Sequence, residues 1–184
     1  KEAKKNWDLF YKRNTNKFFK NRHWTTREFE ELITNTSDST DDNSIENSLK
    51  CLCLNECDNQ DERLNSSNDK ISNLLEVGCG VGNLIWPLIE EGTKLFIYAC
   101  DFSSKAIDLL KKNPLYDESK CYAFEVDITQ VNMNNNNQDD DSEDNRYSTI
   151  SSCLPHGVMI DIVSLVFVLS AIHPDKMETA LKNI

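Results

Sequence analysis

Residues 74–83 read Leu-Leu-Glu-Val-Gly-Cys-Gly-Val-Gly-Asn. A short apolar run stops at three glycines spaced one residue apart, Gly78, Gly80 and Gly82, and a second apolar run, 84–89, follows. This pattern predicts a buried strand, a tight turn and the start of a helix. Glycines suit such a turn because they adopt positive φ and let a ligand approach the backbone. The free N–H groups at a helix start can bind a polar or anionic group, so we predict a nucleotide-type cofactor site.

Two further predicted strands end in carboxylates. The apolar run 95–100 ends at Asp101, 23 residues after the first glycine of the turn, and the run 121–126 ends at Asp127. A carboxylate at the tip of the second strand, roughly 20 residues beyond the glycines, is where α/β folds bind ribose hydroxyls. Because ligands bind at the carboxyl ends of parallel strands, the three strand ends predict one continuous site.

The other predicted elements alternate in the same way. A serine at 103 or 104 can cap a helix over 105–112, residues 160–169 form an almost wholly apolar fourth strand, and a helix begins at Pro174. Alternation of strands and helices with short links predicts a parallel sheet with helices on both faces. The fold class is therefore α/β and Rossmann-like over residues 71–184.

Two polar stretches interrupt this pattern and carry most of the negative charge. The 184-residue chain has a net charge of −11, of which residues 34–70 carry −6 and residues 132–152 carry −4, whereas residues 1–33 carry +4. Residues 34–70 have too few apolar residues to offset the chain entropy, so we predict a disordered or loosely ordered insert there. Residues 132–152 are predicted to form a second, low-complexity insert. Their acidity does not exclude an RNA partner for the rest of the chain.

Cysteine usage and hydropathy limit the class of protein. The seven cysteines are odd in number and are expected to be reduced thiols. Cys51, Cys53 and Cys57 have no matching second pair or histidine nearby, so we predict no metal site. No run of 18 apolar residues and no apolar leader occur, so we expect no membrane span and no secretion. A cytoplasmic location, with the nucleus as the alternative, is expected.

The N-terminal segment 1–33 interleaves aromatic and basic side chains. Trp7, Phe10 and Tyr11 recur at helical spacing and share one face, which either packs on a core or covers the cofactor as a lid. Aromatic rings stack on bases while Lys and Arg bind phosphates, so the segment also suits an RNA-facing edge. The basic residues expected to face RNA are Lys12, Arg13, Lys17, Lys20, Arg22 and Arg27.

The glycine pattern is Gly-x-Gly-x-Gly preceded by Glu76, not the Gly-x-Gly-x-x-Gly of dinucleotide dehydrogenases. It resembles motif I of class I S-adenosylmethionine-dependent methyltransferases. Asn-Trp-Asp-Leu-Phe-Tyr-Lys-Arg-Asn at 6–14 and Phe-Val-Leu-Ser-Ala-Ile-His-Pro-Asp-Lys-Met at 167–177 resemble the methyltransferase-like tRNA 3-methylcytidine methyltransferases. The resemblance covers nearly everything outside the two polar stretches. It is strongest to the branch that acts on serine tRNAs, the methyltransferase-like-six type.

This resemblance implies methyl transfer from S-adenosylmethionine to nitrogen-3 of a cytidine in the tRNA anticodon loop, the position that the family numbers 32. It also implies seryl-tRNA synthetase as a partner. The residues that it assigns to the cofactor are Trp7, Tyr11, Gly78, Gly80, Asp101, Phe102, Asp127, Ile128 and Val166. Class I enzymes place substrate contacts after the fourth strand, so Ser170, His173 and Asp175 are candidate base contacts. A structural role for His173 at a helix start is equally compatible.

Two other functions are compatible with the same residues. A class I methyltransferase for a protein or a small molecule would share the cofactor half alone, and a cofactor-binding fragment could be inactive. Class I methyltransferases have seven strands, and the predicted strands end with the fourth. We therefore expect the domain to be truncated after strand four.

Overall fold

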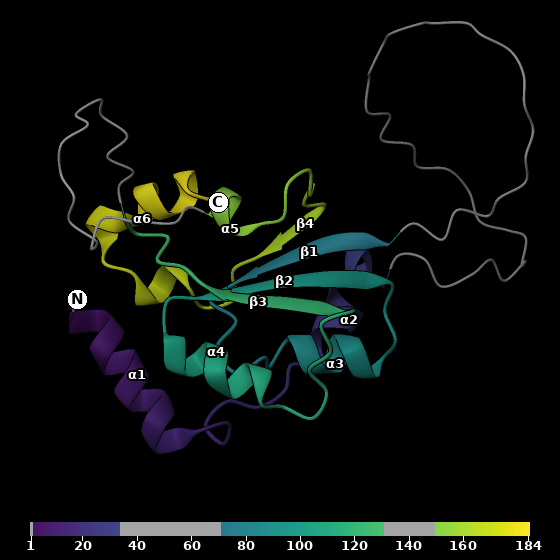
Figure 1. Cartoon of the computed structure of the whole chain (residues 1–184), viewed down its shortest axis with the longest axis horizontal. Helices are drawn as coiled ribbons and strands as arrows, with labels where there is room; N and C mark the ends of the chain where they lie inside the picture. The colour runs from purple at the N-terminus through teal and green to yellow at the C-terminus, as the bar shows by residue number, and fades with distance from the viewer. Residues whose placement is uncertain (1, 34–70, 131–149) are drawn as a thin grey trace, which may run out of the picture.

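The computed structural model describes residues 2–33, 71–130 and 150–184 (Figure 1). The predicted insert 34–70, with its three cysteines, and most of the insert 132–152 lie outside the described residues. In the described part, four parallel strands form one sheet in the order β3-β2-β1-β4. The strands are β1 (Ser72–Val77), β2 (Leu95–Asp101), β3 (Cys121–Glu125) and β4 (Ile162–Ser164).

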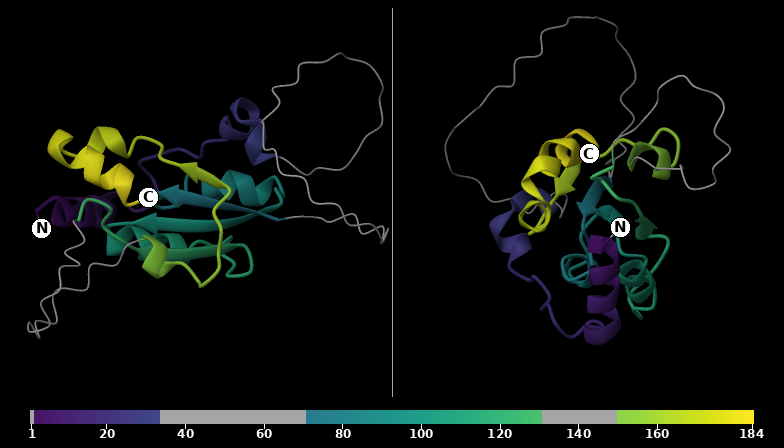
Figure 2. Two further views of the ribbon diagram at one scale, coloured as in Figure 1. Left: turned by 90° about the horizontal axis from the view of Figure 1, so that it is seen from above. Right: turned by 90° about the vertical axis from the view of Figure 1, so that its left-hand side faces the viewer.

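Helices cover both faces of this sheet, as the alternating sequence pattern predicts (Figures 1 and 2). Along β1, Leu74 joins the apolar cluster under α3 (Ile85–Glu90) and α4 (Ser104–Lys111). The next residue, Leu75, joins the opposite cluster with α5 (Ile150–Cys153) and α6 (Pro174–Lys182). Both leucines are fully buried, because successive side chains of a central strand point to opposite faces.

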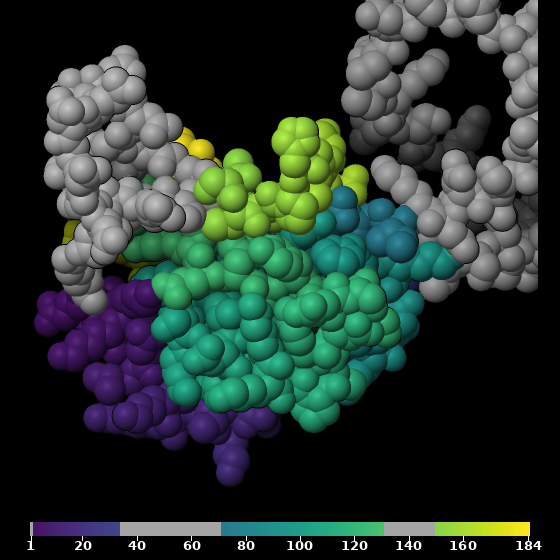
Figure 3. Space-filling view, viewed as in Figure 1, coloured from purple at the N-terminus to yellow at the C-terminus, as the bar shows by residue number. Residues whose placement is uncertain are grey.

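The N-terminal segment lies on the α3/α4 side of the sheet. Its helix α1 (Glu2–Asn14) packs against α4, where Tyr11 contacts the cluster that contains Val81 and Ala106. In the space-filling view, α1 lies directly against the body of the domain (Figure 3). The segment continues through α2 (Thr25–Glu28) and a 3₁₀ turn, η1 (Glu30–Leu32), and Leu32 joins the core under α3.

The fourth strand is much shorter than predicted. The apolar run 160–169 predicts an extended strand throughout, but β4 pairs with β1 only over Ile162–Ser164. The backbone then leaves the sheet, because Phe167 adopts φ +63°, which is incompatible with extended pairing. A 3₁₀ turn, η2 (Leu169–Ala171), precedes α6. The apolar side chains after β4 are used to cover the carboxyl end of β1, not to extend the strand.

The start of α4 is joined to α1 through one buried serine. The Ser103 hydroxyl accepts the backbone N–H of Ala106 at 3.2 Å, as expected of a helix N-cap. The same hydroxyl donates to a carboxylate oxygen of Asp8 at 2.5 Å. Ser103 is completely buried, so its side chain both caps α4 and attaches the N-terminal helix to the domain.

Ser103→Ala removes the cap and the bond to Asp8 together. We expect the free energy of unfolding to fall by about 1–2 kcal/mol, the usual cost of removing an N-cap hydroxyl. Urea unfolding followed by circular dichroism measures the change. The matched control is Ser104→Ala, at the adjacent exposed position, which should remain within about 0.5 kcal/mol of the wild type. Equal destabilisation in the two variants would contradict the structural role of Ser103.

Candidate functional site

A cavity of about 350 Å³ lies at the carboxyl ends of β1, β2 and β3. Its volume is within the usual range of a small-molecule site, roughly 300–1,000 Å³. The structure brings every residue predicted to contact the cofactor into its wall, together with one of the three candidate base contacts. These residues are Trp7, Tyr11, Gly78, Gly80, Asp101, Phe102, Asp127, Ile128, Val166 and His173.

The glycine-rich turn forms the centre of the wall. Gly78 and Gly80 have φ of +70° and +56°, so the predicted left-handed backbone is confirmed. A Cβ atom on Gly78 would lie 2.5 Å from Val168 Cγ2, and one on Gly80 would lie 2.8 Å from the Tyr11 hydroxyl oxygen. The turn therefore packs against both α1 and the segment after β4, and neither position has room for a larger side chain.

Asp101 is fixed beside this turn by backbone hydrogen bonds. One carboxylate oxygen accepts the N–H of Gly80 and the other accepts the N–H of Ser103, both at 2.9 Å. Burial raises the pKa of Asp101 to about 6, although these N–H donors act in the opposite direction. A carboxylate has about four lone-pair sites, so Asp101 can also accept a hydroxyl hydrogen from a ligand in the cavity.

Asp127 is oriented by two residues that the sequence pattern does not single out. Its oxygens accept from the backbone and hydroxyl of Thr129, at 2.9 and 2.7 Å, and from the side-chain amide of Gln130 at 2.7 Å. Burial alone would raise the pKa of Asp127, but these donors bring the pKa below its usual value. Asp127 is therefore held as a carboxylate, with Thr129 and Gln130 also in the cavity wall.

Helix α1 closes another side of the cavity with aromatic rings. Trp7 and Tyr11 stack with their ring centroids 5.9 Å apart and their planes inclined by 30°. Tyr11 is 5% exposed, and burial together with the charge of Asp101 raises the pKa of its hydroxyl well above the usual value. The aromatic face thus packs on the core and lines the cavity at once.

Arg22 also lies in the cavity wall, although the sequence pattern predicts that it faces RNA. Its backbone N–H donates to the carbonyl of Asn83 at 2.8 Å, and the Asn83 amide donates to the carbonyl of Phe19 at 3.1 Å. The Arg22 guanidinium lies 5.7 Å from the centre of the Phe167 ring and has a nitrogen 4.0 Å from the Glu76 carboxylate. Asn83 directly follows the last glycine of the glycine-rich turn. The sequence around Asn83 gives no sign that this residue binds the N-terminal segment.

Of the three candidate base contacts, one lines the cavity. His173 lines the cavity and also caps α6, since its Nδ1 accepts the N–H of Asp175 at 3.4 Å. Ser170 is exposed outside the cavity wall and donates to the carbonyl of Phe167 at 3.0 Å. The Asp175 side chain is 86% exposed. The structure therefore supports a cavity position for His173 alone: Ser170 lies in η2, and Asp175 faces solvent although its carboxylate is 3.4 Å from His173 Nδ1.

The remaining residues predicted to face RNA lie on the surface. Lys12, Arg13, Lys17, Lys20 and Arg27 are all exposed. Among the described residues, no three side chains of the metal-ligating types come together. No helix in the same part of the chain has the length and apolarity to cross a membrane.

A model of the methyltransferase domain family matches residues 75–184. The chain belongs to this family. It is 44% identical over 183 residues to human tRNA N(3)-cytidine methyltransferase METTL6, a match covering 100% of this chain and 48% of the relative. It is 37% identical to the Xenopus tropicalis enzyme METTL2 (97% of this chain, 49% of the relative) and to trm141 of Schizosaccharomyces pombe (100% and 54%). The resemblance seen in the sequence is thus confirmed, and the chain spans about half the length of the curated relatives it matches.

Glu76, on β1 two residues before Gly78, is a second buried carboxylate besides Asp101. The residue is 1% exposed, and among the described residues its Oε2 has no hydrogen-bond partner. Burial raises the pKa of Glu76 to about 8, against the opposing effect of Arg22. The folded protein therefore retains a proton that the unfolded chain releases, and stability should fall as the pH rises from about 5 to 8, by at most about 1.4 kcal/mol per pH unit.

Glu76→Gln should remove this part of the pH dependence. As the pH rises from about 5 to 8, the free energy of unfolding should fall less for the variant than for the wild type. The difference between the two falls should be greatest at pH 8. Urea unfolding at a series of pH values measures it. Glu118→Gln, at an exposed position, is the control and should keep the wild-type slope. A slope that Glu76→Gln leaves unchanged would show that Glu76 titrates normally.

Proposed function

We propose that this protein transfers a methyl group from S-adenosylmethionine to nitrogen-3 of a cytidine in the anticodon loop of tRNA, with serine tRNA as the substrate. One observation carries the proposal. The family-specific segments at 6–14 and 167–177, more than 150 residues apart in the sequence, meet in the same cavity as the glycine-rich turn. The relatives with which the whole chain aligns are named as tRNA N(3)-cytidine or tRNA N(3)-methylcytidine methyltransferases.

The residues of the cavity are compatible with S-adenosylmethionine. Asp101, fixed by two N–H donors, would accept the ribose hydroxyls, and Asp127 would accept the amine of the adenine. Trp7 and Tyr11 would cover the bound cofactor, so we assign residues 1–33 the role of a lid. When bound, S-adenosylmethionine supplies an electrophilic methyl group on its sulfonium centre.

Methylation of cytosine at nitrogen-3 makes modest demands on the protein. The neutral base carries an in-plane lone pair at this atom, so no strong general base is required. The residues of the site must hold an extruded base edge-on to the methyl group and exclude water. Phe167, which is 74% exposed at the cavity wall, and the Arg22 guanidinium beside it offer a ring and a cation for this purpose. His173 is the remaining candidate for a polar contact with the base.

The degree of identity to the different relatives bears on the choice of tRNA and of a partner protein. Similarity is greater to the METTL6 relatives, at 42–44% identity, than to the METTL2 relatives, at 35–37%. The methyltransferase-like-six type, which the segments at 6–14 and 167–177 resemble, is the branch that acts on serine tRNAs. We therefore propose serine tRNA as the substrate and seryl-tRNA synthetase as a partner.

The experiment that tests this function measures methyl transfer from labelled S-adenosylmethionine by the full-length protein. Serine tRNA should be labelled, and the same tRNA with its loop cytidine replaced by uridine should not. Equal labelling of both tRNAs would defeat the cytidine assignment. Label on a protein or small molecule, with none on tRNA, would favour the other class I activities instead.

Gly80→Ala tests the contact between the turn and the lid. The new Cβ would lie 2.8 Å from the Tyr11 hydroxyl, so Tyr11 must move, and we expect S-adenosylmethionine affinity to fall at least about tenfold. Isothermal titration calorimetry measures the change. Gly92→Ala is the matched control, because Gly92 also has positive φ (+68°) but no atom within 4 Å of the added Cβ. If Gly92→Ala weakens binding equally, general destabilisation and not displacement of the lid explains the weaker binding.

A further inference from the structure

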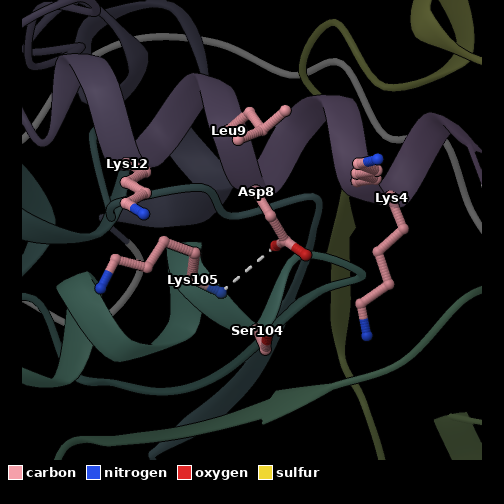
Figure 4. A pocket seen from close by; sticks show the side chains of 7 residues that line it. Lys4, Asp8, Leu9, Lys12, Ser104 and Lys105 are labelled. Carbon is pink, nitrogen blue, oxygen red and sulfur yellow. Dashed lines mark hydrogen bonds between the residues drawn. The ribbon is translucent and has the colours of Figure 1, made fainter.

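A groove of about 490 Å³ lies between α1 and the start of α4 (Figure 4). Seven residues line it, and four of them are lysines. The lining consists of Lys4, Lys5, Lys12 and Lys105, with Asp8, Leu9 and Ser104. A hollow in which lysines outnumber acids four to one attracts an anionic ligand, although the chain as a whole is acidic.

The spacing of residues along α1 explains why the helix has this second face. Lys5, Asp8 and Lys12 recur at three- and four-residue intervals, so they share one stripe of the helix. Trp7 and Tyr11 belong to the neighbouring stripe that lines the cofactor cavity. One helix therefore separates an aromatic cavity from a basic groove.

Three of the four lysines have no ion-pair partner among the described residues, so their charges can attract a ligand. Lys4 pairs with Glu125, whereas Lys5, Lys12 and Lys105 form no ion pair with any described residue. Figure 4 shows the side chains of Lys12 and Lys105 extending on the same side of Asp8. Lys5 and Lys12 are exposed, and Lys105 is half-buried.

Asp8, the one acidic residue of the groove lining, is already hydrogen-bonded to α4 and its cap. Asp8 accepts from the Ser103 hydroxyl at 2.5 Å and from the backbone N–H of Lys105 at 3.4 Å. Because Ser103 and Asp8 already cap α4, the affinity of the groove for anions does not depend on the helix N-terminus. It depends on the three lysine side chains.

We propose that this groove binds the phosphate backbone of the tRNA, and this inference rests on the proposed function. Lys5 and Lys12 are seven residues apart, about 10 Å along the helix, so the cations follow a line as a nucleic-acid backbone does. A membrane surface would require an apolar face beside the cations, and Leu9 is the single large apolar residue of the lining. Lys4 lines both the groove and the cofactor cavity, so RNA in the groove would pass close to the site of methyl transfer.

The test uses the full-length protein and two triple variants with the same change in charge. The first replaces the unpaired lysines of the groove: K5Q/K12Q/K105Q. The control replaces three exposed lysines beyond the groove: K111Q/K112Q/K120Q. Binding of serine tRNA is measured by fluorescence anisotropy at several salt concentrations, and S-adenosylmethionine binding is measured in parallel.

The groove variant should bind tRNA at least about tenfold more weakly near 0.15 M salt. The slope of log affinity against log salt concentration should become shallower by about 2 to 3, roughly one for each phosphate that is no longer neutralised. The control should stay within about twofold of the wild type, and cofactor affinity should be unchanged in both variants. Unchanged cofactor affinity also shows that the groove variant is folded.

Several results would overturn the inference. Equal weakening by both variants would mean that overall charge, not the groove, determines affinity. Wild-type tRNA affinity in the groove variant, with impaired binding to anionic lipid vesicles, would assign the groove to a membrane surface. Failure of the wild type to bind or methylate any tRNA would remove the proposed function itself. Normal methylation by a groove variant with wild-type affinity would remove the groove assignment alone.

Discussion

The carboxylate of Asp101 is the interaction on which the site depends. It accepts N–H groups from the turn after β1 and from the start of α4, and so joins two elements that are not adjacent in the sequence. A buried carboxylate is tolerated only when it is hydrogen-bonded, so Gly80 and Ser103 must present their N–H groups at these positions. Ser103 in turn binds Asp8 of α1. The turn, the helix and the N-terminal segment are therefore connected through one acid.

Glu76 lies at the same edge of the sheet but has a different environment. Its neighbouring cation, Arg22, is 4.0 Å away, and within the described chain its Oε2 lacks a hydrogen bond. Desolvation therefore dominates for Glu76, whereas N–H donors partly offset it for Asp101. Two buried acids twenty-five residues apart thus differ in role: Asp101 organises the turn, whereas Glu76 lies beside Arg22 of the N-terminal segment and keeps its proton near neutral pH.

The parts of the fold that depend on local patterns could be predicted from the sequence. Apolar runs ending in glycine or aspartate located β1, β2 and β3, and the serines at 103 and 104 located the start of α4, because each signal lies within a few residues of its consequence. The length of β4 could not be predicted in this way. A phenylalanine rarely adopts positive φ, so nothing in the apolar run 160–169 indicates that the backbone turns at Phe167. The position of Arg22 shows the same limit for the site. Basic and aromatic residues alternate throughout 1–33, and contacts with distant residues, Glu76 among them, decide which cation enters the cavity.

Helix α1 combines these constraints in one element. Its aromatic stripe must match the cavity, because Tyr11 approaches the backbone of Gly80 so closely that no Cβ fits between them. Its polar stripe must match α4, because Asp8 completes the hydrogen bonds of Ser103. Any displacement of α1 therefore changes the cavity and the basic groove together. Since one helix forms a wall of each, the cavity and the groove cannot be positioned independently.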